Sequence, residues 1–251
     1  MNFELLLVVL TLLSGLLWGW DKWLRGSEGI DRDQDPWYID LPRSLFPVIL
    51  IVLLLRSFVA EPFRIPSGSM LPTLHAGDFI LVNKSAYGFR LPLVRTRLFG
   101  DGKPERGEVA VFRYPLDPSQ DYIKRIIGLP GDKIRYHDRV FYVNGEPLEQ
   151  SKVGPYQRSD AGDSAVVYRE EAGDNDYRIL HHEESASANF TYEVPEGHYF
   201  AIGDNRDRSA DSRYWGPVDD DYLAGRAMLI WMSWDSAEGG IARDRIGRSI
   251  E

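Results

Sequence analysis

The sequence predicts a mainly β protein that follows two membrane-spanning helices. Two apolar stretches lie within the first 60 residues of the 251-residue chain. Beyond them, short alternating or apolar runs are separated by Gly, Pro, Asn and Asp, a pattern typical of strands and turns. One such pair, Asn144 and Gly145, directly follows an apolar run and favours a hairpin turn, because both residues tolerate positive φ.

The first apolar stretch runs from Phe3 to Trp20 and is broken only by Glu4. At a rise of 1.5 Å per residue, about 18 helical residues nearly cross a bilayer core of about 30 Å. Trp18, Trp20 and Trp23 suit the membrane interface at its end. A cleaved signal peptide is the alternative, but no Lys or Arg precedes the stretch and no small-x-small site follows it closely. We therefore expect a permanent anchor over residues 1–20.

The second stretch, residues 45–60, is interrupted by Arg56 after about eleven apolar positions, a length that is also typical of a buried helix. Ser44 is a plausible N-cap, and Pro47 falls in the first turn, where proline is tolerated. Arg56 can extend its guanidinium group toward lipid head groups. We expect a second membrane-spanning helix here.

Four basic residues lie in the connecting loop, residues 21–44, whereas the short N-terminus has none; they are Lys22, Arg25, Arg32 and Arg43. The positive-inside rule therefore places this loop in the cytoplasm and everything after residue 60 outside it.

The rest of the chain divides into three parts. Residues 61–145 and 194–251 have strand-like patterning, whereas residues 146–193 are polar and acidic. We interpret residues 146–193 as an inserted β-rich subdomain within one β-sheet domain. Six runs are candidate strands: residues 79–83, 108–114, 122–129, 134–143, 198–202 and 224–234.

Composition excludes several classes of function. The net charge of −9 and the pI near 5.1 give a nucleic-acid partner no electrostatic support. The chain has no cysteine, so it has no disulfide, no thiolate catalysis and no cysteine metal site. Its acidic motifs lack the turn glycine and the bidentate glutamate of a calcium loop. We expect no metal and no cofactor.

A serine-rich turn follows the second apolar stretch. Pro66 and Pro72 flank Ser67, Gly68 and Ser69, and the glycine permits backbone conformations that other residues avoid. Such a turn can present one hydroxyl and one backbone N–H to the same point. On these residues alone an ordinary surface turn is the better interpretation, because Ser and Gly are common in turns.

Lys124 makes a catalytic interpretation stronger. On a strand its side chain shares a face with Tyr122 and Ile126, and the flanking isoleucines can exclude water. Burial lowers the pKa of a lysine from about 10.4 toward neutrality, so that the amine can take a proton from a serine hydroxyl. Arg125 cannot serve, because a guanidinium group stays protonated. A solvated or ion-paired strand lysine is the alternative.

A third polar segment, residues 203–216, follows a short apolar run. It is either a plain loop, a cation site built on Asp204 and Asp207, or a set of side chains that support a nearby base. The missing glycine and glutamate argue against the cation site.

These three segments resemble, in order, the serine, lysine and C-terminal motifs of bacterial type I signal peptidases. The residues that match are 65–74, 121–125 and 203–213. The resemblance covers residues 61–132 and 198–233 and includes the two anchors. Any one motif is weak, but three in order are highly specific. The resemblance implies a catalytic domain on the outer, periplasmic side of the bacterial cytoplasmic membrane.

Roles carry over from the family by position. Ser69 is similar to the nucleophile and Lys124 to the general base, while Ser67 matches the hydroxyl that completes the oxyanion hole with the Ser69 N–H. Ser209 matches the hydroxyl that orients the lysine. An ion pair near the site is matched by Asp211 and Arg213.

The resemblance also implies the substrate contacts and partners. Residues like those of the shallow S1 and S3 pockets are Phe63, Ile65, Leu74 and Ile123. An extended substrate is expected to pair beside Tyr122 to Lys124 as an added strand. The expected substrates are preproteins with signal peptides that end in Ala-x-Ala. We expect contact with membrane lipid, no nucleic acid, and a monomer.

Other classes stay open from the residues alone. A Ser–Lys autoprotease shares the dyad chemistry, but needs a soluble partner region in place of two anchors. A membrane-anchored β scaffold needs neither Ser69 nor Lys124. A Ser-His-Asp hydrolase requires a histidine near the serine, and none has a recognisable nucleophile-elbow context; the candidates are His75, His137, His181, His182 and His198.

Overall fold

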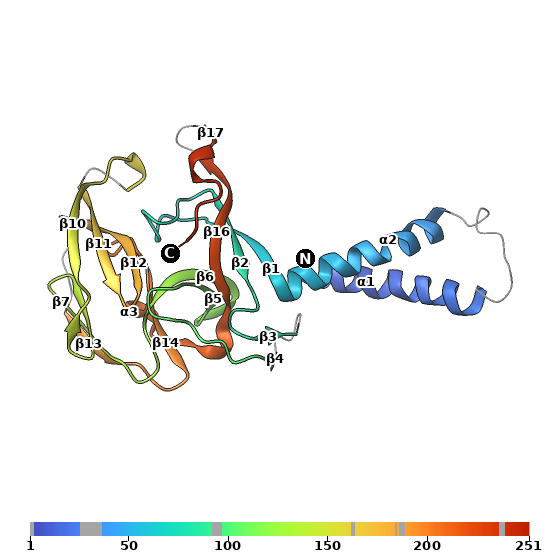
Figure 1. Cartoon of the computed structure of the whole chain (residues 1–251), viewed down its shortest axis with the longest axis horizontal. Helices are drawn as coiled ribbons and strands as arrows, with labels where there is room; N and C mark the ends of the chain where they lie inside the picture. The colour runs from blue at the N-terminus through green and yellow to red at the C-terminus, as the bar shows by residue number, and fades with distance from the viewer. Residues whose placement is uncertain are drawn as a thin grey trace. The chain divides into compact units, whose positions relative to one another are not determined.

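The computed structural model describes residues 3–25, 37–91, 97–161, 164–183, 185, 189–235 and 239–250. Two compact units make up the chain (Figure 1). The helical unit comprises Met1–Glu61 and Phe89–Phe99, and the β unit comprises Pro62–Gly88 and Gly100–Glu251.

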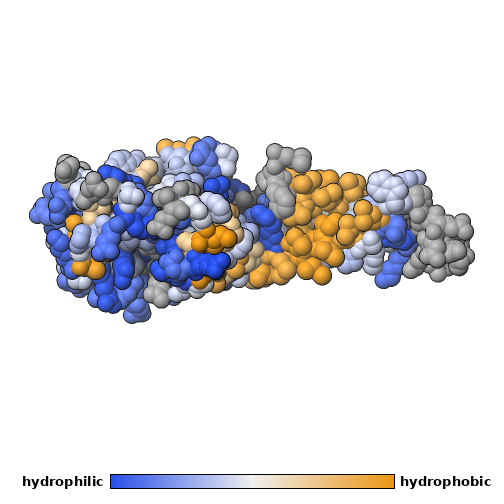
Figure 2. All heavy atoms as spheres, turned by 90° about the horizontal axis from the view of Figure 1, so that it is seen from above, coloured by the Kyte–Doolittle hydropathy of each residue, from blue (hydrophilic) through white to orange (hydrophobic). Residues whose placement is uncertain are grey.

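Two long helices form most of the helical unit. Helix α1, Phe3–Trp20, continues into a π-helical turn, Asp21–Arg25, and helix α2, Trp37–Leu54, continues into a second, Leu55–Val59. Both helices are long and apolar enough to cross a membrane. Figure 2 shows a hydrophobic surface along the middle of these helices.

The two helices pack antiparallel. Trp18 of α1 contacts Phe46 of α2 with ring centroids 5.3 Å apart, and Asp21 lies 3.1 Å from Arg43. Gly15 provides room for this contact, since a Cβ there would lie 2.9 Å from the Phe46 ring. Small residues at a crossing let helices approach closely in this way.

The start of α2 differs from the prediction. The helix begins at Trp37, and the Ser44 hydroxyl donates to the carbonyl of Leu41 inside the helix instead of capping it. Pro47 also lies within the helix, after its first turn. The helix starts earlier than Ser44 and Pro47 indicated, because the apolar residues Trp37, Tyr38 and Leu41 extend it toward the N-terminus.

A short hairpin completes the helical unit. Strands β3, Phe89–Arg90, and β4, Arg97–Phe99, are antiparallel. The Phe89 ring lies 6.3 Å from that of Phe58 at the end of the second helix and 4.6 Å from that of Phe99.

The β unit is built on an eight-stranded sheet of order β1-β2-β16-β5-β6-β14-β15, with β17 paired to β16 (Figure 1). The strands are β1 Ala60–Arg64, β2 Asp78–Asn83, β5 Val109–Tyr114, β6 Asp117–Gly128, β14 His198–Ile202, β15 Val218–Asp219, β16 Leu223–Asp235 and β17 Gly240–Ile241. The described part of the β unit also contains single turns of helix in the connections: η4 Ser159–Ala161, α3 Ser212–Trp215, η5 Asp220–Tyr222 and η6 Arg243–Arg245.

Two smaller sheets hold the predicted insert. One has the order β10-β11-β12 and the other β13-β7-β8-β9. Their strands are β7 Lys133–His137, β8 Val140–Val143, β9 Glu146–Pro147, β10 Gln150–Pro155, β11 Ala165–Ala172, β12 Asn175–His182 and β13 Phe190–Glu193. Strands β7 and β8 precede residue 146 but belong to a sheet with strands of the insert: β7 pairs with β13, and β8 pairs with β7 and β9.

The predicted mainly β fold class with two N-terminal apolar helices is confirmed. Five of the six candidate strands coincide closely with β2, β5, β6, β14 and β16. The sixth, residues 134–143, is wrong as a single strand, because it folds back on itself at Asp138 and Arg139, whose φ values are 48° and 68°. No glycine marks this turn. The predicted turn at Asn144 and Gly145 is confirmed, with φ of 54° and 93° and strands β8 and β9 on either side.

Candidate active site

Ser69 and Lys124 meet in the β unit. Ser69 lies in the connection between β1 and β2, and Lys124 lies on β6, opposite Ala110 of β5. The Lys124 Nζ is 2.7 Å from the Ser69 Oγ, a hydrogen-bond distance. The two residues are 55 positions apart in the sequence, so the sheet itself brings them together.

The Lys124 amine is buried. Its side chain is 3% exposed, and burial lowers its pKa to about 8, although the nearby carboxylates of Asp211 and Asp204 act in the opposite direction. Nζ also donates to the carbonyl of Ile123 at 2.9 Å. A lysine with this pKa is partly neutral at physiological pH, so it can accept a proton from a neighbouring hydroxyl.

The Ser67 side chain completes a row of polar groups. Its hydroxyl donates to the Ser69 Oγ at 3.4 Å. The turn is closed by a hydrogen bond from the Leu71 N–H to the Gly68 carbonyl at 3.2 Å. Met70 and Leu71 are buried below it, which fixes the turn against the core.

The side chains of Ser67, Ser69 and Lys124 line a cleft of about 620 Å³. Tyr122 and Ile123, two of the predicted substrate contacts, also line it, together with Asp160 from η4. The volume and the mixture of polar and apolar groups suit a short stretch of peptide.

The other predicted substrate contacts lie in the core. Ile65 and Leu74 are 3% and 0% exposed, and they belong to one hydrophobic cluster against which Phe63 and Ile123 pack. Among the described residues, Phe63, Ile65 and Leu74 are not part of the cleft lining. Their role in a substrate pocket stays a prediction.

Buried polar contacts hold the third motif together. Asp211 forms an ion pair with Arg213 at 2.8 Å, and its other oxygen accepts from the Gly203 N–H at 3.1 Å. Arg213 also donates to the carbonyl of Arg206. These bonds fix the two ends of the segment against each other.

Ser209 is buried in the same segment, but its hydroxyl makes no hydrogen bond in the described part of the chain. Its role in orienting Lys124 therefore stays a prediction. Gly203 lies against it, since a Cβ on Gly203 would come within 2.2 Å of the Ser209 Oγ and 2.6 Å of the Ser69 carbonyl.

Asn205 is a site residue that the sequence analysis did not assign. Its side-chain amide donates to the Gly68 carbonyl at 3.0 Å, and its backbone N–H donates to the Ser69 carbonyl at 3.1 Å. The His182 Nε2 lies 3.0 Å from the Asn205 Oδ1. Asn205 stands inside the third motif, but only the folded chain shows that it reaches the serine turn.

Asp204 anchors the same segment from the other side. Its carboxylate accepts from the Arg125 Nε at 2.8 Å and from the Thr73 hydroxyl at 2.5 Å. Arg125 is fully buried, and its guanidinium group lies over the Tyr177 ring at 3.7 Å. The side chains of Lys124 and Arg125 therefore lie on opposite faces of β6.

Neither a histidine nor a metal group stands beside the dyad in the described residues. The hydroxyl of Ser69 has hydrogen-bond contacts with Ser67 and Lys124 and with no histidine there. Within the same ranges, no group of three His, Cys, Asp or Glu side chains is arranged to hold a metal ion.

Comparison with known proteins gives the family. The family described as "Signal peptidase, peptidase S26" matches residues 38–234. Signal peptidase I of Pseudomonas fluorescens is 46% identical over 215 residues, which cover 80% of this chain and 75% of that protein. Signal peptidase I of Pseudomonas aeruginosa is also 46% identical, over 216 residues, with the same shares.

A crystal structure of a signal peptidase I from Enterococcus faecalis is 31% identical and covers 49% of this chain and 96% of that one, with a TM-score of 0.32. The family assignment rests on the family match and the Pseudomonas relatives, and it confirms the resemblance drawn from the three motifs. The chain belongs to the signal peptidase family, peptidase S26, and is a serine endopeptidase of that family.

Proposed function

We propose that this chain removes signal peptides from exported preproteins, with Ser69 as the nucleophile and Lys124 as the general base. The observation that carries the proposal is the 2.7 Å distance between the Lys124 Nζ and the Ser69 Oγ, at a lysine whose pKa burial lowers to about 8. A neutral amine at this distance can take the serine proton without a histidine.

The reaction is an acyl transfer in two halves. The Ser69 Oγ attacks the scissile carbonyl carbon while Lys124 takes the hydroxyl proton, and the carbonyl oxygen becomes an oxyanion. The Ser67 hydroxyl and the Ser69 N–H stabilise that oxyanion. The carbon–nitrogen bond then breaks, and Lys124 returns the proton to the leaving amine. In the second half, Lys124 takes a proton from a water that attacks the ester carbon. The ester carbon–oxygen bond then breaks, and Lys124 gives that proton to the Ser69 Oγ.

Ser209, Asp211 and Arg213 support the base in this proposal. The ion pair between Asp211 and Arg213, at 2.8 Å, keeps the third motif in place beside Lys124. Ser209 is buried in that motif with its hydroxyl unused by the described residues, so it is available to orient the lysine.

We propose that the substrate is cleaved after the sequence Ala-x-Ala, in which a residue of any kind separates two small side chains. Tyr122 and Ile123 line the cleft, and an extended substrate pairs beside them as an added strand. In this proposal the hydrophobic cluster of Ile65 and Leu74, against which Phe63 and the cleft residue Ile123 pack, lies beneath the pockets for the alternate side chains. A shallow pocket over a packed core leaves no room for large side chains.

We also propose that α1 and α2 anchor the enzyme in the bacterial cytoplasmic membrane, with the β unit on the periplasmic side. Both helices have the length and hydropathy for this role. The basic residues of the 21–44 loop favour a cytoplasmic position for it. In this arrangement residues 61–145 and 194–251 form the catalytic domain, and residues 146–193 form the insert. The enzyme acts as a monomer in contact with membrane lipid.

The experiment is cleavage of a separate precursor that bears an Ala-x-Ala site by the wild type, Ser69→Ala and Lys124→Ala. Both variants are expected to lose at least about 10³-fold in kcat/KM. Ser151→Ala and Lys133→Ala, which change exposed residues on β10 and β7, are the matched controls and should retain activity. Full activity in either dyad variant would contradict the proposal, and a wild type that cuts only itself would favour an autoprotease.

A further inference from the structure

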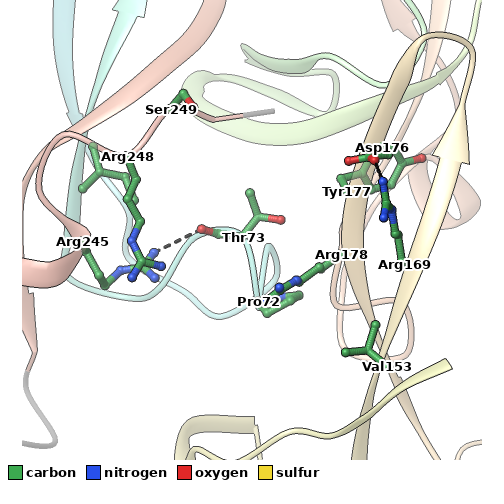
Figure 3. Close-up of a pocket in the computed structure, with 11 residues that line it drawn as sticks. Pro72, Thr73, Val153, Arg169, Asp176, Tyr177, Arg178, Arg245, Arg248 and Ser249 are labelled. Carbon is green, nitrogen blue, oxygen red and sulfur yellow. Dashed lines mark hydrogen bonds and ion pairs between the residues drawn. The ribbon is translucent and has the colours of Figure 1, made fainter. Parts of the chain in front are cut away.

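A second cleft in the β unit, also of about 620 Å³, is lined by arginines (Figure 3). It lies beside Pro72 and Thr73, which follow the serine turn in the sequence. Figure 3 shows Arg245 and Arg248 entering from one wall, whereas Arg169 and Arg178 come from the strands of the opposite wall. In a chain with net charge −9, four arginines and one acidic residue, Asp176, line this cleft.

The strand wall places like charges together. Arg169 of β11 and Arg178 of β12 are direct cross-strand partners. Like charges in this position destabilise a sheet, so folding alone gives no reason for the pair. Arg169 forms an ion pair with Asp176, but Arg178 is exposed and has no ion-pair partner in the described part of the chain.

On the opposite wall, hydrogen bonds to Asp78 and Thr73 fix the position of Arg245. Arg245 is 7% exposed, and it donates Nε to Asp78 at 3.0 Å and Nη2 to the Thr73 carbonyl at 3.1 Å. These bonds fix the guanidinium group and leave Nη1 for a ligand. Arg248 has a 56% exposed side chain; its Nε donates to the Asp244 carbonyl at 2.7 Å, and its Nη2 forms a surface ion pair with the Asp244 carboxylate at 3.2 Å. A surface pair of this kind is weak, so Arg248 can exchange its partner.

We propose that this cleft binds a phosphate group. Guanidinium groups that approach from two walls suit a tetrahedral anion, whose oxygens accept hydrogen bonds from several directions, better than a planar carboxylate that fits one guanidinium fork. The cleft has the volume of a small-molecule site, which accommodates a phosphate ion or a lipid head group. The phosphate belongs to a lipid head group or to a free ion, and both present the same oxygens.

The test uses the full chain in a neutral detergent and measures the thermal unfolding midpoint and the Kd. One arm titrates inorganic phosphate against chloride at matched ionic strength, and the other compares short-chain phosphatidylglycerol with short-chain diacylglycerol, which has no phosphate. The midpoint is expected to rise with phosphate or with phosphatidylglycerol, because a ligand that binds only the folded state stabilises it. A rise in the first arm identifies a free phosphate as sufficient, whereas a rise only in the second identifies the head group.

The variant Arg178→Gln/Arg248→Gln removes two of the three exposed cleft arginines and leaves the buried pair of Arg245 and Asp78 intact. It is expected to weaken the Kd by at least about tenfold, the loss of one charge-assisted contact. Lys133→Gln/Arg135→Gln changes the net charge equally at exposed positions of β7 and should bind as the wild type does. No rise in either arm, or an equal rise in the cleft variant, would overturn the proposal; the protease activity is a separate measurement.

Discussion

Asn205 joins the third motif to the turn that carries the serine: its side-chain amide donates to the Gly68 carbonyl at 3.0 Å. A carbonyl can only accept, so the Gly68 carbonyl requires the amide NH2 on its side and leaves the Asn205 Oδ1 to face the His182 Nε2 at 3.0 Å. The backbone of Asn205 holds the next carbonyl, that of Ser69. The position of the nucleophile therefore depends on a residue that lies 136 positions later in the chain.

Asn205→Asp tests this contact, because aspartate has nearly the same shape but cannot donate to the Gly68 carbonyl. We expect kcat to fall by about tenfold or more with little change in KM, since the serine turn shifts while the substrate cleft stays. Asn189→Asp is the matched control, because the one contact of the Asn189 side chain within the described ranges is to accept from the Asp138 N–H. Steady-state kinetics that show equal kcat for Asn205→Asp and the wild type would remove Asn205 from the positioning of the turn.

Gly203 is the next position where the two segments touch. An alanine Cβ there would lie 2.2 Å from the Ser209 Oγ and 2.6 Å from the Ser69 carbonyl, so one of these groups must move. A shift of about 1 Å in a reacting group lowers the rate by about 100-fold, and we expect Gly203→Ala to lose activity by this order. Gly240→Ala is the control, because nothing lies within 4 Å of a Cβ at that position. Precursor cleavage at the wild-type rate by Gly203→Ala would show that the contact relaxes without moving Ser69.

The sequence was enough to predict the parts of the fold and site that are local. Residues that are neighbours in the sequence are enough to recognise a strand with alternating polarity, the turn at Asn144 and Gly145, and each of the three motifs. The turn at Asp138 and Arg139 was missed because no glycine marks its positive φ values.

Contacts between distant segments could not be predicted in the same way. The bonds of Asn205 to Gly68, and of Arg125 to Asp204, depend on which loops the sheet order brings together. Similarly, the unexpected pairing of β7 with β13 is a long-range register that no short window of sequence contains.

The burial of Lys124 predicts a pH-dependent cost to stability. Its folded pKa of about 8 is below the unfolded value near 10.5, so the unfolded chain binds more protons between these two pH values, and stability rises with pH across that window. Below about pH 8 the full cost of the buried charge is present. Lys124→Met, which removes the charge, is therefore expected to unfold at higher denaturant than the wild type at neutral pH, with a difference that shrinks toward pH 10.5.

Lys133→Met serves as the control for that experiment, since Lys133 is exposed on β7 and its replacement should leave stability nearly unchanged at every pH. Denaturant titrations at several pH values give the comparison. A difference between Lys124→Met and the wild type that is the same at all pH values would mean that Lys124 has an ordinary lysine pKa.

The buried ion pair of Arg206 and Glu170 connects the third motif to β11 of the insert. The two side chains are 1% and 0% exposed, and Tyr177 and Gln150 also donate to the Glu170 carboxylate. Glu170→Ala leaves a buried guanidinium group unpaired, so we expect a loss of about 3–5 kcal/mol in the free energy of unfolding.

Asp244→Ala breaks the exposed pair with Arg248 and is the matched control, with an expected loss of less than about 1 kcal/mol. Chemical denaturation of both variants measures the contrast. Equal losses in the two variants would show that the insert is not held to the third motif by this pair.

The most direct test of Lys124 as the base for Ser69 is the pH dependence of kcat/KM for a precursor with an Ala-x-Ala site. The base must be neutral, so the rate is expected to rise with pH and reach a plateau above an apparent pKa of about 8, the value that burial gives Lys124. A rate that rises only near the ordinary lysine pKa of about 10.4, or one that does not change from about pH 6 to about pH 10, would contradict the account.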